Sequence, residues 1–260
     1  MTYYASNIDR YVIDGVTFRG RPSEYGPLPA GAFLLPDGVK RWRGGVTVRA
    51  EDVPRISADG SFATPGSLSA RTSEWKALVL AHNDNELGEW EDIITGIGVG
   101  RLFPATGQAL GRVLSSTARA AETPTFDRRR GRVGGMVAAE TAFQLVHPDP
   151  FLYAEEITAG PAASVPIEAR GVAESWPTLT VRNAGGAYTV TGGGATFTMT
   201  TPLPGGAVDV IESASMTVRR NGVLVESGFS GWVAPIPKRG LVSYTASAGT
   251  VEVLTRPRLL

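Results

Sequence analysis

Short segments of alternating apolar and polar residues follow one another through the second half of the chain. Their apolar pairs are Leu179/Val181, Tyr188/Val190, Phe197/Met199, Val208/Val210 and Met216/Val218, and the runs 241–245 and 251–253 continue the pattern. Between them lie glycine-rich turn signals at 183–186, 192–194, 204–206 and 220–223. The strongest is Asn221-Gly222, because a type I′ hairpin turn needs two positive φ angles. Short strands with a turn about every ten residues predict a β-sandwich or β-barrel.

The first half of the chain is also mainly β by its pattern. Strands are predicted within 11–18, 42–49, 70–81 and 134–146, with a turn at Asp14-Gly15 in the first of them. Residues 112–119 would tolerate a short helix, but their Ser-Ser-Thr centre favours a strand. Prolines and glycines crowd 20–38 and recur through 50–68, so these two stretches are predicted to be long loops.

One stretch of the first half has helical spacing. Its apolar residues are Leu87, Trp90, Ile93, Ile94 and Ile97. Asn83, three residues before Glu86, resembles the start of a capping box, and acidic residues near this end suit the helix dipole. Gly96 and Gly98 supply the stop. We therefore predict one helix that begins after Asn83.

The sequence His147-Pro148-Asp149-Pro150 ends the last strand of the first half abruptly. Each proline lacks a backbone donor and restricts the residue before it, so the chain must leave any sheet here. The corner predicts two domains, 1–154 and 155–260. Structural residues are expected on both sides of it. Phe143 and Leu145 face one way on the strand, and the residues expected to form the domain junction with them are Pro148, Asp149, Pro150, Phe151 and Tyr153.

Composition and charge narrow the possible functions. The 260 residues are 42% hydrophobic and 19% charged, which is typical of a folded, water-soluble chain. Because 25 basic residues balance 25 acidic ones, the chain lacks the basic surplus of a nucleic-acid binder or of a membrane-surface anchor. No stretch has the length of a membrane span or the pattern of a signal peptide. The basic run 128–132 suggests either a nucleic-acid patch or a solvated hairpin turn, and the balanced charge favours the turn.

The sequence offers little catalytic chemistry. It contains no cysteine, which excludes disulfides, thiolate zinc sites and a cysteine nucleophile. The chain has two histidines, His82 and His147, but it has no G-x-S-x-G nucleophile elbow with which either could form a hydrolase triad. The alternating set His82, Asp84 and Glu86 has oxygen and nitrogen ligands for a hard cation, but a solvated helix cap explains it better. We predict no enzyme, no cofactor and no metal site.

Two weaker possibilities remain open. Asp149 with Glu155 or Glu156 could supply the pair of carboxylates of a glycoside hydrolase, if the fold placed them across a cleft. Trp176 and Trp232 could stack on sugar rings or contact a partner, although tryptophan in a sandwich more often belongs to the core or the rim.

Several short motifs resemble the distal tail proteins of long-tailed bacteriophages. Residues 143–153 fit the pattern F-x-L-x-x-x-D-P-F-x-Y that closes the first domain in that family. Further similar stretches are 171–185, 208–211, the Asn-Gly hairpin at 216–224, the approach to the last strands at 235–244, and the basic-proline tail 256–258. The first half agrees in layout, with an early Ile-Asp-Gly-Val strand and a strand that runs into a helix near Trp90.

The resemblance implies a structural protein of the virion. Its first domain would be a tail-tube-like β-barrel or sandwich with one helix that forms a ring, usually a homo-hexamer. Its second would be a galectin-like β-sandwich at the periphery. The partners implied are the tail tube protein, the tail-tip hub, receptor-binding or fibre proteins and, in some phages, a host saccharide. The protein would be made in the host cytoplasm and reside at the distal end of the tail. The alternative is a carbohydrate-binding module or adhesin without catalysis.

Overall fold

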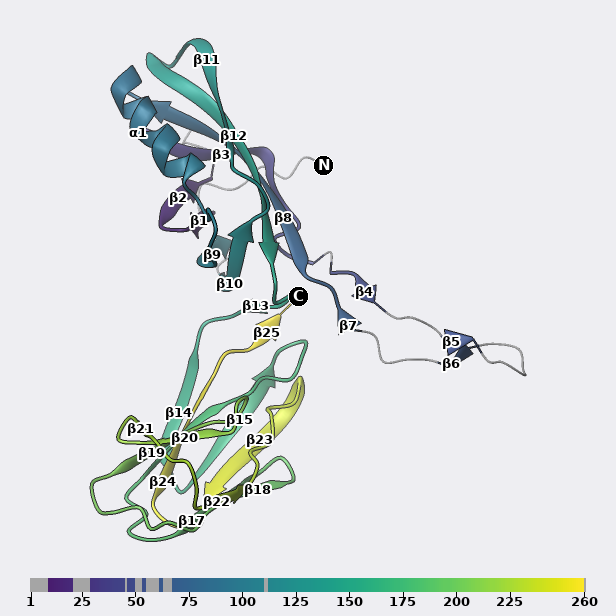
Figure 1. Cartoon of the computed structure of the whole chain (residues 1–260), viewed down its shortest axis with the longest axis vertical. Helices are drawn as coiled ribbons and strands as arrows, with labels where there is room; N and C mark the ends of the chain where they lie inside the picture. Colours follow the sequence, from purple (N-terminus) through teal and green to yellow (C-terminus); the bar gives the residue numbers. More distant parts are fainter. Residues whose placement is uncertain are drawn as a thin grey trace. The chain divides into compact units, whose positions relative to one another are not determined.

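The computed structural model of the chain describes residues 9–20, 29–44, 46–49, 53–54, 61–62, 67–109 and 112–259. The contacts between residues divide it into two compact units, one up to Leu152 and one from Tyr153 to Leu259. Figure 1 shows the strands of both units and the helix of the first unit. The proline-containing corner lies just before this division.

A closed β-barrel forms the body of the first unit. Its seven strands follow one another in the order β12-β8-β3-β2-β1-β9-β10, and β12 pairs again with β10, which closes the circle. Their bounds are β1 Arg10–Ile13, β2 Val16–Arg19, β3 Gly31–Lys40, β8 Arg71–Ala81, β9 Phe103–Ala109, β10 Arg112–Ala120 and β12 Met136–His147. β11 Thr125–Val133 extends this sheet beside β12. Neighbouring strands of the barrel are antiparallel except β2 and β3, which run parallel. Two further short strands are β13 Leu152–Tyr153 and β25 Arg258–Leu259.

Aromatic side chains fill the barrel interior. Phe143 lies parallel to Trp75, with 6.1 Å between the ring centres, and its other neighbour is Phe18 at 5.5 Å. Tyr11 and Trp42 extend the cluster through edge-to-face contacts, an arrangement that the ring quadrupoles favour. These residues come from segments that are far apart in sequence, so the cluster depends on closure of the barrel.

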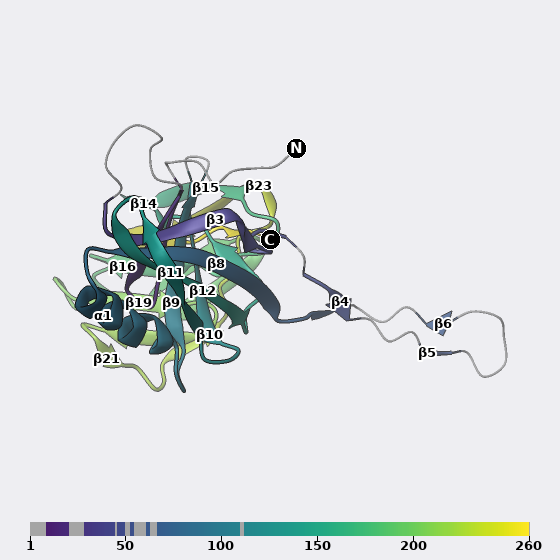
Figure 2. The ribbon, with the colours of Figure 1, turned by 90° about the horizontal axis from the view of Figure 1, so that it is seen from above.

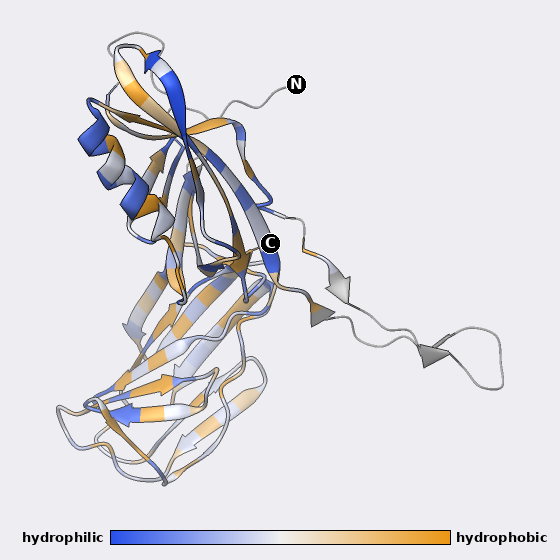
Figure 3. Cartoon of the chain, turned by 45° about the horizontal axis from the view of Figure 1, so that its top comes forward, coloured by the Kyte–Doolittle hydropathy of each residue, from blue (hydrophilic) through white to orange (hydrophobic). Residues whose placement is uncertain are grey.

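The predicted helix is confirmed as α1, Asp84–Thr95. The Asn83 side chain accepts a hydrogen bond from the Glu86 N–H, which satisfies one of the free donors of the first turn. α1 packs against β8, β12 and β11, with Leu87 and Ile94 buried. Figure 2 places it on the outside of the barrel, and in Figure 3 its polar and apolar residues lie on different sides.

Two predictions for the first half are wrong where the structure can be compared. The stretch 20–38 is no loop throughout, because β3 begins at Gly31 and buries Phe33 and Leu34. Pro36 is accommodated at an irregularity, since the pairing of β3 with β8 shifts register between Leu34 and Val39. The segment 42–49 is no continuous strand, because only Val48–Arg49 (β4) is extended and paired.

The stretch 50–68 also contains paired strands within the described residues. β4 pairs with β7 (Ser67–Leu68), and β5 (Val53–Pro54) pairs with β6 (Ser61–Phe62). Both pairs form ladders of their own, separate from the barrel sheet. The rest of the predicted loop lies outside the described residues.

The basic run 128–132 is solvent-exposed as predicted, but it is not a turn. It belongs to β11, and the turn follows at Gly134 and Gly135, whose φ angles are +60° and +84°. Gly131 (φ +92°) lies in a register shift between Arg128 and Arg132, and this bulge lets the strand run on. β11 is hydrophilic in Figure 3 and pairs with β12 alone among the described strands. Charge along an outer strand opposes edge-to-edge aggregation.

Two antiparallel sheets form the second unit. The first has the order β14-β24-β16-β19-β20-β21 and the second β15-β23-β17-β18-β22. The strands of the first are β14 Ile157–Ala162, β24 Thr250–Thr255, β16 Thr178–Arg182, β19 Val208–Glu212, β20 Thr217–Arg220 and β21 Val223–Leu224. Those of the second are β15 Ser164–Arg170, β23 Arg239–Ala246, β17 Tyr188–Gly192, β18 Ala195–Met199 and β22 Phe229–Gly231. One hydrophobic core takes side chains from both sheets, so the unit is a two-layer sandwich.

Most of the predicted alternation holds in this core. The pairs of β16, β17 and β18 are buried as expected, and Asn221-Gly222 forms the hairpin with φ angles of +49° and +86°. The phase predicted for β19 is wrong. Asp209 and Ile211 are the buried residues of that strand, while Val208 and Val210 are half-buried on its other face. Met216 is also misassigned, since it lies in a turn with φ +51° before β20.

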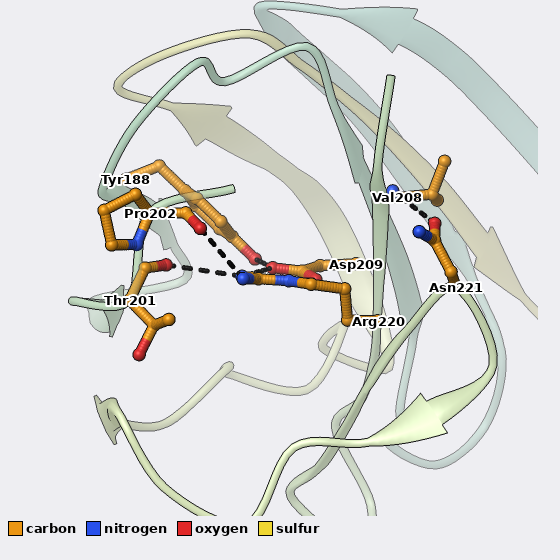
Figure 4. A network of polar contacts seen from close by, with 7 residues as sticks. All are labelled: Tyr188, Thr201, Pro202, Val208, Asp209, Arg220 and Asn221. Carbon is orange, nitrogen blue, oxygen red and sulfur yellow. Dashed lines mark hydrogen bonds and ion pairs between the residues drawn. The ribbon is translucent and has the colours of Figure 1, made fainter. Parts of the chain in front are cut away.

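Asp209 faces the core because it has partners there (Figure 4). Arg220, on the neighbouring strand β20, donates to both carboxylate oxygens at 2.8 and 2.9 Å, and Tyr188 of the opposite sheet donates at 2.8 Å. Arg220 also donates to the carbonyls of Pro202 and Thr201, at 2.8 and 3.3 Å. Burial, together with the Asp209 carboxylate, strongly raises the pKa of Tyr188, so the phenol stays protonated and remains a donor. The network ties one sheet to the other.

Removing Arg220 tests this network. In Arg220→Ala the fully buried Asp209 carboxylate loses its cation, and breaking a buried pair costs about 3–5 kcal/mol of unfolding free energy. The matched control is Arg170→Ala, whose partner Glu168 is mainly exposed, and we expect a loss below about 0.5 kcal/mol there. Urea unfolding of both variants measures the difference. Equal losses of unfolding free energy in the two variants would show that the buried pair stabilises the fold no more than the exposed pair does.

Phe143→Ala tests the barrel interior. Phe143 is 5% exposed and stacked on Trp75, and truncation of a buried phenylalanine costs about 3–5 kcal/mol. Leu102→Ala, at a position 56% exposed in the same unit, is the control and is expected to change stability by less than about 0.5 kcal/mol. Calorimetry of the full chain follows the transition of the first unit. A wild-type melting temperature for Phe143→Ala would contradict the burial of this ring.

Candidate functional site

Two of the predicted junction residues, Asp149 and Pro150, lie near a buried arginine. Arg71, the first residue of β8, is 1% exposed inside the barrel. Its Nη1 donates to the carbonyl of Trp42 at 2.7 Å, and its Nη2 donates to the carbonyl of Pro150. Burial lowers the pKa of Arg71, while nearby Asp149 raises it and so favours the charged form. The guanidinium therefore fastens the chain at its exit from the barrel.

The corner itself is shaped by local hydrogen bonding. The Asp149 side chain accepts from the Phe151 N–H at 3.0 Å, the turn-forming contact typical of aspartate next to proline. Leu145 and Leu152 are buried, and Phe151 is half-buried. In the second unit, Arg258 lies over the Tyr153 ring at 6.0 Å from its centre.

His147 lies fully buried at the end of β12, between two serines. Its Nε2 is 2.8 Å from the Ser73 hydroxyl, and its Nδ1 is 3.1 Å from the Ser116 hydroxyl. A serine beside a histidine resembles part of a hydrolase triad, but Nδ1 faces a hydroxyl in place of the orienting carboxylate. Ser73 is also fully buried and accepts from the Trp75 indole at 2.8 Å. The arrangement is built for packing, with no exposed nucleophile.

Several of the other catalytic candidates have local structural partners. The Glu86 carboxylate accepts from both the His82 N–H and the His82 ring, at 2.7 and 2.8 Å, which holds the start of α1. Among the described residues, no group of three or more acidic or histidine side chains is placed to hold a metal ion. Glu156 pairs with Arg256 in the second unit, whereas Asp149 belongs to the first. No helix in the described part of the chain has the length and apolar character to cross a bilayer.

The two predicted tryptophans, in contrast, meet in one groove of the second unit. Its volume is about 490 Å³. The lining residues are Glu174, Trp176, Gly193, Trp232, Ala234, Pro235, Pro237, Leu241 and Val242. Trp176 is 43% exposed and Trp232 is 50% exposed, so neither indole belongs to the core. The site is open to solvent and mainly apolar.

A short antiparallel bridge explains one wall of the groove. The backbones of Ser175 and Ile236 exchange two hydrogen bonds, at 3.0 and 2.8 Å, and both side chains point into the core. Because side chains alternate across an extended segment, the residues on either side of each must point outward. These are Glu174 and Trp176 on one segment and Pro235 and Pro237 on the other, and all four line the groove.

Glycines make the rest of the groove possible. Gly231 (φ +79°) leaves no room for a side chain, since a Cβ would lie 2.1 Å from the Thr196 carbonyl oxygen. The same carbonyl accepts from the backbone N–H of Trp232 at 3.2 Å, which holds the main chain at this residue. Gly193 in the β17–β18 turn lets the chain approach Ala234, where a Cβ would come within 2.8 Å. The turn at 192–194 was predicted, but its place beside Trp232 was not.

Because His147 is buried, we expect the stability of the fold to depend on pH. Burial, reinforced by Arg71, lowers its pKa to about 4, against 6.5 for a free histidine. Between these values the unfolded chain binds a proton that the folded chain excludes, so stability falls as the pH decreases from about 6.5 to 4, by on the order of 3 kcal/mol.

His147→Gln removes this titration. We expect the variant to be less stable at neutral pH but to lose less stability than the wild type between pH 6.5 and 4, as measured by urea unfolding at several pH values. Parallel pH profiles for the two proteins would contradict a neutral, buried His147.

The fold has a relative among solved structures, although no protein-family model and no curated protein sequence matches the chain. SPP1 Dit (gp 19.1), described as a paradigm of the hub adsorption apparatus of phages that infect Gram-positive bacteria, matches with a TM-score of 0.67 at 17% identity. The match covers 97% of this chain and 100% of that one. Two structures of the activated phage P2 baseplate, with calcium and with strontium, match with a TM-score of 0.46 at 7% and 8% identity. They cover 85% and 95% of this chain and 90% and 98% of the matched chains. The resemblance to phage distal tail proteins predicted from the motifs is thus confirmed at the level of the fold, which this chain shares with SPP1 Dit over nearly its whole length.

Proposed function

We propose that this chain is a structural virion protein that forms a ring at the distal end of a phage tail. The observation that carries the proposal is the full-length match of both units, in one chain and in the same order, to the SPP1 Dit fold. A barrel or a sandwich alone occurs in many unrelated proteins, whereas a match to both together is more specific. The motifs at the corner and in the second unit support the same assignment.

We assign a different role to each of the two units. The barrel is the tail-tube-like, ring-forming part, with an outer strand β11 and the paired segments β4–β7 available for contacts between subunits. The sandwich is galectin-like and peripheral. We propose that the ring connects the tail tube protein to the tail-tip hub and to receptor-binding or fibre proteins. The chain performs this work without a cofactor, as part of the virion.

The mass in solution tests the ring. Six copies of the 27.4 kDa chain give about 164 kDa, and a closed cyclic ring is the expected arrangement for one subunit type with head-to-tail contacts. Light scattering of the full chain, alone and mixed with the tail tube protein of the same phage, measures this mass, and negative-stain images show whether there is a central hole. A chain that stays monomeric even with its tail tube protein would rule out the ring.

The fragment 155–260 tests which unit carries the contacts. Its core takes side chains from both sheets of the sandwich and contains no residue of the barrel. We expect it to be soluble, β-rich by circular dichroism, cooperative in melting and monomeric in light scattering. An unfolded fragment would mean that the two halves depend on each other, and an oligomeric fragment would move the ring contacts to the sandwich.

A further inference from the structure

We propose that the groove lined by Trp176 and Trp232 binds an extended, proline-containing peptide segment of a partner protein, one with an arginine or lysine beside its prolines. The proposal goes beyond the ring and rests on the second unit alone. Exposed tryptophans are also common in sugar-binding sites, but other features of this groove favour a peptide.

The lining of the groove favours a peptide over a saccharide. Of its nine residues, only Glu174 carries a charged side chain, and the rest are tryptophan, proline, glycine and aliphatic residues. Each sugar ring presents several hydroxyl groups that lose water on binding and need hydrogen-bond partners. The side chains of the groove offer only one carboxylate and two indole N–H groups for this purpose. A proline segment brings rigid apolar rings and few polar groups, which suits this surface.

The combination of aromatic walls and an acidic edge also matches a known mode of recognition. Proline-rich segments form the left-handed polyproline helix, which is already ordered before binding and docks into aromatic-lined grooves. The groove is likewise held in place, by the Ser175–Ile236 bridge on one side and by the bond from Trp232 to the Thr196 carbonyl on the other. When both surfaces are ordered in advance, little conformational entropy is lost on binding.

Glu174 sets the charge of the partner. Its side chain is exposed, and no ion pair or hydrogen bond of the described residues uses its carboxylate. Arg258 donates to the main-chain carbonyl of Glu174 at 3.3 Å. The carboxylate is therefore available to a ligand, and an arginine or lysine next to the prolines would pair with it at the edge of the groove.

The test uses the full chain and a defined probe, an acetylated octaproline that ends in two arginines. Binding is followed by the intrinsic fluorescence of the tryptophans and by calorimetry. We expect Trp176→Ala and Trp232→Ala each to weaken binding by about tenfold or more, because each removes a wall of the groove. Glu174→Gln should abolish the advantage of this probe over octaproline without arginine and leave the affinity for the neutral peptide unchanged. Val223→Ala is the control, since Val223 is 71% exposed in the same unit but outside the groove.

Three results would overturn the proposal. Equal affinity for a glycine-serine peptide with the same two arginines would reduce the interaction to charge. Binding of oligosaccharides of hexoses or amino sugars that is lost in Trp176→Ala would make the groove a sugar site. Absence of binding by either octaproline at about millimolar concentration would leave the groove without this function. Melting curves of each variant show that it is folded, and the ring measurement is independent of every one of these outcomes.

Discussion

The first unit depends on one strand, β12, which pairs with three others. It lies against β8 along almost its whole length, against β11 over its first part and against β10 at its end. The pairing of Leu145 and Val146 with β10 is what closes the barrel. Because side chains alternate, this single register also decides that Phe143 and Leu145 point inward, and a slip by one residue would expose both. The same register of β12 thus closes the barrel and places the side chains of its core.

The end of that strand shows how polar side chains hold the chain where it leaves the barrel. His147 fills the last inward position and has a serine hydroxyl at each ring nitrogen. The prolines that follow cannot continue a ladder, and Arg71 binds the carbonyl of Pro150 from inside the unit. Sequence reasoning treats a histidine and a carboxylate near prolines as candidate chemistry. The contacts of His147 with two buried serine hydroxyls and of Asp149 with the Phe151 N–H give them a structural role instead.

Features with a local cause were predictable from the sequence. The cap at Asn83 and the Asn221-Gly222 turn need only a few neighbouring residues, and both are present. Features with a distant cause were not. Asp209 points inward because Arg220 and Tyr188 are its partners there. The strand that begins at Gly31 accommodates Pro36 where its pairing with β8 shifts register. Trp176 and Trp232 were singled out as possible sugar or partner contacts, but a groove assembled from four separate segments cannot be seen in a linear pattern.

The groove differs from the rest of the molecule in what it leaves exposed. Many of the aromatic rings that the structure describes are buried inside the barrel or the sandwich core, where each buried ring contributes roughly 1.5–3 kcal/mol to stability. Two indoles half-exposed in one apolar groove forgo part of that gain, and a contiguous apolar surface of this kind favours association with another molecule. The network that joins the two sheets, in which Tyr188 of one sheet donates to Asp209 of the other, contains neither indole. Because Trp176 and Trp232 are each about half exposed, their burial in the sandwich is incomplete, and the proposed peptide would cover the surface that remains.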